Sequence, residues 1–256
     1  MLAAEIRGHS MVSIRDDEDL LTSCVFGHLR YLSPQTVWDK FLSSARGVRD
    51  GQSGESLVEA LKRELGLSDV TIGMYESVRV LFWRRHRTGD EPDLLIVFSG
   101  GLKRSLVLLV EVKLWAKKSG HGEFDQLSRY LKLLRGLPGF RMDVGDVPCA
   151  FVVYLTPRYA HAEIEESSRE LHGDAGVRDK ILGVQWQDLL VACRRSEPRN
   201  TIERMVVEDI AALLVRRGLE YFDGMLHIPN LPRFDPGSAR FYVSGIRHCF
   251  MGFSFV

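Results

Sequence analysis

The sequence predicts an α/β fold, made of one large domain and a C-terminal extension. The chain has 256 residues, 45% of them apolar and 27% charged, which is typical of a globular protein with a sizeable core. Segments with helical periodicity alternate with short aliphatic runs typical of buried strands. No repeat or low-complexity linker interrupts this order, so we assign residues 1–200 to the domain and 201–256 to a helix and an aromatic-rich extension packed on it.

Helices are predicted where apolar side chains recur every three or four residues. Ser33 and Pro34 suit the start of the second helix, and Gly66 suits the end of the third. The polar, glycine-containing segment 46–53 between these two helices predicts a loop. The predicted helices cover residues 18–31, 33–42, 53–65, 124–135, 164–171, 187–193 and 201–217.

Strands are predicted where four to nine mainly aliphatic residues lie between turn signals. Ser99 to Lys103 contains two adjacent glycines, which predicts a turn between the second and the third strand. Thr156 and Pro157 close the fourth strand. The predicted strands cover residues 78–82, 94–98, 106–114, 150–155 and 181–186.

Composition restricts the class of protein. The 34 basic and 34 acidic residues cancel, which argues against a generally polybasic binder but not against a local basic patch. The four cysteines lie far apart with no CxxC pair, so we predict neither a zinc knuckle nor a disulfide framework. No apolar run approaches the roughly 20 residues of a membrane helix, and the first residues lack a signal pattern. We therefore expect a cytoplasmic protein with no membrane partner.

Two carboxylates and a lysine fall on the predicted hairpin. Side chains alternate along a strand, so Glu111 and Lys113 share one face while Val112 points to the other. The turn at Gly100 folds the strand that follows Asp93 back beside that of Glu111, so the two carboxylates can converge. Converging carboxylates suit Mg²⁺ or Mn²⁺.

Two polar residues of the following helix can reach the same pocket. Gln126 and Tyr130 are spaced i, i+4 and share a helix face. A metal that polarises a phosphoryl oxygen, a cation that stabilises developing charge and polar positioning groups together suit hydrolysis of a phosphodiester. A structural salt bridge between Glu111 and Lys113 is the alternative, but it leaves Asp93 unexplained.

The order Pro92-Asp93, then Glu111-x-Lys113, then Gln126-x-x-x-Tyr130 resembles the PD-(D/E)XK nuclease superfamily, in particular its RecB-like branch. The resemblance implies a restriction-endonuclease-like three-layer core, with a central mixed β-sheet flanked by helices. It implies that Asp93 and Glu111 are catalytic metal ligands and Lys113 the catalytic lysine. It also implies that Gln126 and Tyr130 support the site and contact nucleic acid.

Many members of this superfamily also carry an acidic residue on the first core helix. Glu18 is our candidate for this third metal ligand, and Glu55 and Glu59 compete with it. Residues 76–118 hold nine basic and five acidic side chains, so this stretch is the candidate basic patch. Its predicted contacts to the DNA backbone include Arg84, Arg85 and Lys117, with His86 as part of the same phosphate-facing cluster.

The leading hypothesis is therefore a Mg²⁺- or Mn²⁺-dependent deoxyribonuclease, in a setting such as phage defence, restriction or DNA repair. The alternative is a catalytically silent or partner-dependent nucleic-acid-binding subunit of a larger assembly, because a fold can be reused without its chemistry. DNA is the expected partner in both cases. A homodimer or a partner protein is a further expectation, since cutting both strands often uses two active sites.

Overall fold

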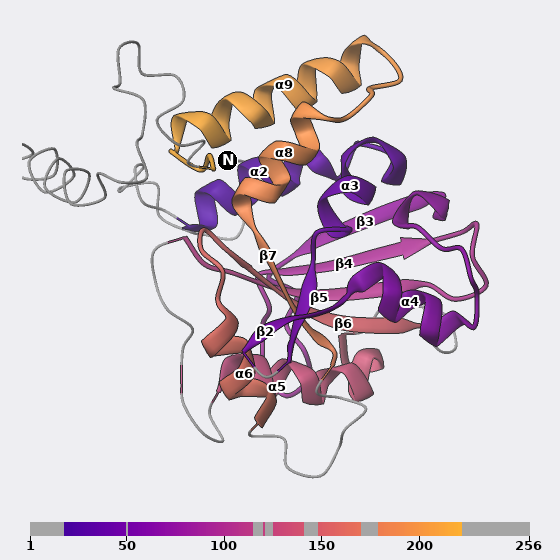
Figure 1. The fold of residues 1–256 in the computed structure, drawn as a ribbon, viewed down its shortest axis with the longest axis vertical. Helices are drawn as coiled ribbons and strands as arrows, with labels where there is room; N and C mark the ends of the chain where they lie inside the picture. Colours follow the sequence, from indigo (N-terminus) through magenta and orange to yellow (C-terminus); the bar gives the residue numbers. More distant parts are fainter. Residues whose placement is uncertain are drawn as a thin grey trace, which may run out of the picture. The chain divides into compact units, whose positions relative to one another are not determined.

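The computed structural model describes residues 18–49, 51–114, 120, 125–140, 148–169 and 179–221. Residues 1–220 form one compact unit and residues 221–256 a second, and the fold in Figure 1 is that of the first unit. The predicted packing of an aromatic-rich extension falls almost wholly outside the described residues. No helix in the described ranges combines the length and apolarity needed to cross a membrane.

Seven strands form one mixed sheet in the order β2-β1-β7-β6-β5-β4-β3. β3, β4 and β5 pair antiparallel, β5, β6 and β7 pair parallel, and β1 runs antiparallel to both β2 and β7. All five predicted strands are confirmed to within two residues. The strands are β1 (Arg46–Arg49), β2 (Gln52–Ser56), β3 (Ser77–Phe82), β4 (Leu94–Ser99), β5 (Leu106–Val112), β6 (Cys149–Thr156) and β7 (Ile181–Gln185).

The seven predicted helical segments are also found, with shifted ends. The segment 33–42 divides into a π-helical turn and a short α-helix, and the segment 124–135 continues as a 3₁₀ stretch. The helices are α2 (Glu18–Leu29), η1 (Pro34–Trp38), α3 (Asp39–Leu42), α4 (Leu57–Leu65), η2 (Ile72–Met74), α5 (Gln126–Leu133), η4 (Leu134–Phe140), α6 (His161–Arg169), α8 (Trp186–Arg194) and α9 (Thr201–Arg216).

The predicted loop over residues 46–53 is wrong, because the edge hairpin β1–β2 occupies it. This hairpin pairs through its backbone, with Val48 opposite Ser53, and Gly51 adopts a φ of +73° at its turn. Its polar side chains lack the aliphatic signal of a central strand, as is common at sheet edges. The next helix accordingly starts later, at Leu57, where Ser56 and Glu59 form a capping box.

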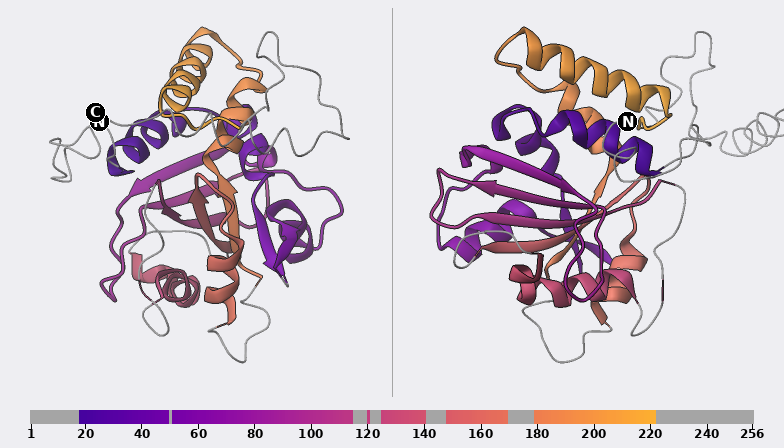
Figure 2. Two further views of the ribbon diagram at one scale, coloured as in Figure 1. Left: turned by 60° about the vertical axis from the view of Figure 1, so that its left-hand side comes forward. Right: turned by 180° about the vertical axis from the view of Figure 1, so that it is seen from behind.

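The sheet lies between two helical layers (Figures 1 and 2). Leu108 and Val110 of β5 pack into the core that includes α2, α3, α4, α8 and α9, whereas Val107 and Leu109 pack into the core that includes α5 and α6. This alternation is the period of two expected of a strand buried on both faces. The same alternation, continued to the end of β5, places Glu111 on the α5 side of the sheet.

Candidate functional site

The register of the β4–β5 hairpin brings Asp93 and Glu111 together. Leu94 pairs with Val110, so one step further along an antiparallel ladder Asp93 lies opposite Glu111. The Oδ2 atom of Asp93 accepts a hydrogen bond of 2.7 Å from the backbone N–H of Val112. Within the described residues its other oxygen, Oδ1, has no hydrogen-bond partner. The hairpin thus holds two opposing carboxylates and leaves an oxygen of Asp93 for a ligand.

Glu111 is a fully buried carboxylate, with 0% of the residue exposed. Its Oε1 atom lies 2.6 Å from Nζ of Lys113, and its Oε2 atom accepts a hydrogen bond of 3.1 Å from the hydroxyl of Tyr130. A buried charge is stable only when such partners replace water. The strand end therefore carries a carboxylate that its neighbours hold in one orientation.

Lys113 is clamped between two carboxylates, those of Glu111 at 2.6 Å and Glu18 at 3.2 Å. Its backbone is fixed as well, because its N–H donates to the carbonyl of Leu155 and its carbonyl accepts from the indole of Trp186. Burial alone would lower the pKa of Lys113, but the nearby carboxylates raise it above its usual value. The side chain is therefore a protonated cation at neutral pH.

Both opposing carboxyl groups have raised pKa values. Burial raises the pKa of Asp93 well above its usual range, and the adjacent charge of Glu111 raises it further. Burial also raises the pKa of Glu111, against the opposing effect of Lys113. Two like charges in a poorly solvated place repel each other. A cation bound between them would relieve this repulsion.

Gln126 and Tyr130 of α5 form a polar chain that leads to Glu111. The amide Nε2 of Gln126 donates to the Tyr130 hydroxyl at 3.1 Å, and that hydroxyl lies 3.1 Å from the carbonyl of Glu91 as well as from Glu111. Tyr130 is only 2% exposed, so it supports the site from within. Its contact with nucleic acid, and that of Gln126, stay predictions.

Glu18 is the one of the three candidate helix acids that lies beside Lys113. Its Oε2 atom accepts from the backbone N–H of Leu114 at 2.7 Å, and its Oε1 atom faces the Lys113 ammonium. Glu59 instead caps α4, and Glu55 pairs with Arg63 at 3.0 Å. Glu18 therefore joins α2 to the end of β5, and its role as a metal ligand stays a prediction.

The basic residues after β3 line a hollow, a cavity of about 500 Å³ between Trp83 and Phe140. Arg84 donates from Nε to the carbonyl of Phe140 at 3.0 Å, and the exposed Arg85 pairs with Glu91 at 3.2 Å. Glu91 is also the residue whose carbonyl contacts Tyr130. The hollow thus adjoins the carboxylate site through this residue. Lys117 lies outside the described residues.

His86 is not a phosphate-facing residue, contrary to our expectation. It is 4% exposed, and its two ring nitrogens bond to Thr88 and to the carbonyl of Gly136. Its ring also packs against Phe140, with 4.8 Å between centroids. His86 is therefore a structural residue that joins the β3–β4 loop to η4, and charge counting cannot reveal this contact with a distant segment.

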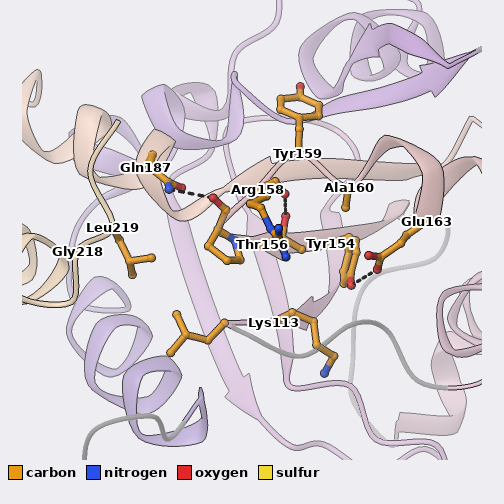
Figure 3. A pocket seen from close by; sticks show the side chains of 12 residues that line it. Lys113, Tyr154, Thr156, Arg158, Tyr159, Ala160, Glu163, Gln187, Gly218 and Leu219 are labelled. Carbon is orange, nitrogen blue, oxygen red and sulfur yellow. Dashed lines mark hydrogen bonds between the residues drawn. The ribbon is translucent and has the colours of Figure 1, made fainter. Parts of the chain in front are cut away.

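Sequence reasoning missed the residues of β6 and α6 that face the same site. Tyr154 pairs in register with Glu111 on the adjacent strand, and its hydroxyl donates to Glu163 at 2.6 Å. Beyond them lies a cavity of about 690 Å³ that Lys113 also lines (Figure 3). A tyrosine inside the aliphatic run of β6 was the available signal, because such a hydroxyl needs a polar partner when buried.

The carboxylates of Asp93 and Glu111 are of the chemical type that Mg²⁺ takes as ligands. Within the described part of the chain, no group of three or more His, Cys, Asp or Glu side chains has the arrangement of a metal cage. Mg²⁺ keeps several waters and is usually held by only one or two carboxylates. Asp93 and Glu111 supply such a pair of hard oxygen donors, and their mutual repulsion favours a cation.

Comparisons with protein-family models, curated proteins and solved structures found no match to this chain. The site consists of the fully buried carboxylate of Glu111, the half-buried residue Asp93 opposite it and a protonated lysine, at the end of a central strand and beside two cavities.

Proposed function

We propose that this protein is a Mg²⁺- or Mn²⁺-dependent deoxyribonuclease with a restriction-endonuclease-like core of the PD-(D/E)XK type. The observation that carries the proposal is the position of Asp93 opposite Glu111, with Lys113 2.6 Å from Glu111, at the end of a buried strand. A structural salt bridge alone needs no second carboxylate opposite Glu111. The mixed sheet between two helical layers is compatible with this core.

Each residue has a distinct role in this proposal. Asp93 and Glu111 hold the metal, which when bound polarises the phosphoryl oxygen and activates water. Lys113, which lies within 3.2 Å of two carboxylates, orients the water and stabilises negative charge that develops at phosphorus. Tyr130 orients Glu111, and Glu18 orients Lys113. Arg84 and Arg85 bind backbone phosphates of the DNA.

A second candidate function is a catalytically silent or partner-dependent nucleic-acid-binding subunit. One observation favours it: both carboxylates nearest to Lys113, those of Glu18 and Glu111, already neutralise its charge. In a silent protein, Glu18, Lys113 and Glu111 would only join α2 to the sheet. The two functions differ in whether divalent metal supports turnover.

The test is cleavage of supercoiled plasmid, linear duplex and single-stranded DNA with Mg²⁺, with Mn²⁺ and with chelator. We expect metal-dependent cutting by the wild-type protein and at least a 100-fold slower rate for Asp93→Asn and for Lys113→Ala, because single groups that stabilise transition-state charge contribute about 10²–10³-fold. Lys132→Ala, which changes an exposed lysine of α5, is the matched control and should cut normally.

Circular dichroism of each variant separates lost chemistry from lost structure. Normal cutting by folded Asp93→Asn and Lys113→Ala would contradict the site assignment. DNA binding by the wild-type protein without cutting of any substrate would favour the second candidate.

A further inference from the structure

The cavity beside Lys113 is formed where β6 ends and α6 and α8 begin (Figure 3). Its volume of about 690 Å³ lies in the range of pockets that enclose small ligands, roughly 300–1,000 Å³. Such a pocket can take one nucleotide of a strand but not the stacked pairs of a duplex. Among the residues that line the cavity are Lys113, Tyr154, Arg158, Tyr159, Glu163 and Gln187.

Arg158 is the cation in this cavity whose charge is still available. Lys113 is paired with two carboxylates, and the carboxylate of Glu163 accepts a hydrogen bond from the hydroxyl of Tyr154. Within the described residues, Arg158 forms no ion pair. Its side chain extends from the end of β6 toward Tyr154 (Figure 3). A phosphate that enters the cavity therefore meets a free guanidinium, the group best suited to bind it.

Two further residues offer contacts to a nucleobase. The Oε1 atom of Gln187 is buried without a hydrogen-bond partner, while its Nε2 atom donates to the carbonyl of Pro157. An unpaired buried acceptor is costly, and rotation of this amide, which lines the cavity, would bring it to a donor from a ligand. Tyr159 at the cavity's edge is 41% exposed and packs against His161, with 4.3 Å between ring centroids. An exposed aromatic ring of this kind can stack on a base.

We propose that this cavity is a binding site for one unpaired nucleotide of a DNA strand, with Arg158 on its phosphate and Gln187 and Tyr159 on its base. The inference rests on the proposed nuclease function and deepens it, because it names the substrate class. A base presents its hydrogen-bonding edge to Gln187 only when it is not paired. The preferred substrate is thus single-stranded DNA or a duplex with an unpaired end.

The test measures binding of fluorescein-labelled 12-nucleotide DNA, single-stranded or as a blunt duplex, by fluorescence anisotropy in chelator. We expect the wild-type protein to bind the single strand at least tenfold more tightly than the duplex. The double variant Arg158→Ala with Tyr159→Ala should lose at least tenfold in affinity for the single strand, because stacking and phosphate contacts both disappear. Tyr159→Phe, which retains the ring, should bind as the wild-type protein does.

The chain contains a matched control in a second Arg-Tyr pair, Arg30 and Tyr31, which follow the C-terminal end of α2. Tyr31 is 69% exposed, and the Arg30 guanidinium lies 4.8 Å from its ring centroid. Because α2 starts at Glu18 beside Lys113, this pair is separated from the site by the length of a 12-residue helix, about 18 Å. Arg30→Ala with Tyr31→Ala should leave both affinities unchanged.

Equal affinity of the wild-type protein for the two DNA forms would overturn the inference, and so would single-strand binding that is insensitive to Arg158→Ala with Tyr159→Ala. Neither result depends on turnover. Failure of the nuclease proposal, seen as no cleavage of any DNA, is therefore distinguishable from failure of this one.

Discussion

The carboxyl group of Asp93 lies in a place that disfavours its own charge. Burial and the adjacent Glu111 both raise its pKa, and the hydrogen bond from Val112 and the charge of Lys113 only partly offset them. A group whose pKa is higher in the folded than in the unfolded state stabilises the fold below its ordinary pKa, and this stability is lost as the pH rises through the folded value. Asp93 therefore reduces stability at neutral pH.

Asp93→Asn should accordingly stabilise the metal-free protein at pH 8. Asparagine can still accept the hydrogen bond from Val112, but it carries no charge to repel Glu111. We expect the melting temperature in chelator to rise by about 2–4 °C, the shift that about 1 kcal/mol produces in a chain of this size. The gain should vanish as the pH falls toward the ordinary Asp pKa of about 3.9. A lower melting temperature at pH 8 would contradict the raised pKa.

Predictability from sequence differs between residues of this site. Asp93, Glu111 and Lys113 are predictable because strand alternation and one hairpin relate them locally. Tyr154 is not predictable, because its position opposite Glu111 depends on the parallel pairing of β5 with β6. The sequence of the about 40 residues between these strands does not specify which strands pair.

A buried histidine, His86, helps to hold the loop between β3 and β4 against η4. His86 contacts Thr88 within its own loop and Gly136 and Phe140 of η4, while the backbone N–H of Arg87 donates to the carbonyl of Gly139. These contacts fix the loop that presents Arg84 and Arg85. A β-carbon at Gly139 would lie 1.8 Å from Nε2 of His86, whereas one at Gly136 would lie at 3.5 Å, an ordinary contact.

Gly139→Ala should therefore destabilise the protein by about 1–3 kcal/mol, the usual cost of overpacking a buried contact. Gly136→Ala should change the free energy of unfolding by less than about 0.5 kcal/mol, as is usual away from such contacts. Urea denaturation of the two variants compares them directly. Equal stability of both would show that His86 can move aside and that the loop is not held in this way.

The central elements were easier to predict than the edge elements. β4, β5 and β6 are buried on both faces, so their aliphatic runs indicate strands without reference to the rest of the fold. The hairpin β1–β2 has mainly polar residues and depends on pairing with β7. Only the tertiary structure makes those residues strands.

At the scale of the whole molecule, the candidate site lies where the sheet changes its pairing. β5 is antiparallel to β4 on one side and parallel to β6 on the other. β4 contributes the position opposite Glu111, and β6 contributes Tyr154 and the approach to Arg158. One strand end thus joins a carboxylate pair to a cavity, and α2 and α5 hold the two from opposite layers through Glu18 and Tyr130.

This arrangement predicts that a divalent metal ion, bound at the end of β5, stabilises the folded protein against unfolding. An ion that binds only the folded protein raises its stability by about 2.7 kcal/mol at 100 times its dissociation constant, so saturating Mg²⁺ should raise the melting temperature by about 5–10 °C. In Asp93→Asn the rise should disappear, because one of the two carboxylates is lost and the repulsion that favoured the cation is already relieved.

Differential scanning fluorimetry with increasing Mg²⁺ measures both proteins side by side, and KCl at matched ionic strength controls for general screening. An equal rise in the two proteins would place the ion elsewhere on the chain. No rise in the wild-type protein would mean that Lys113 already neutralises the carboxylate pair, as the structural salt bridge of a silent protein requires.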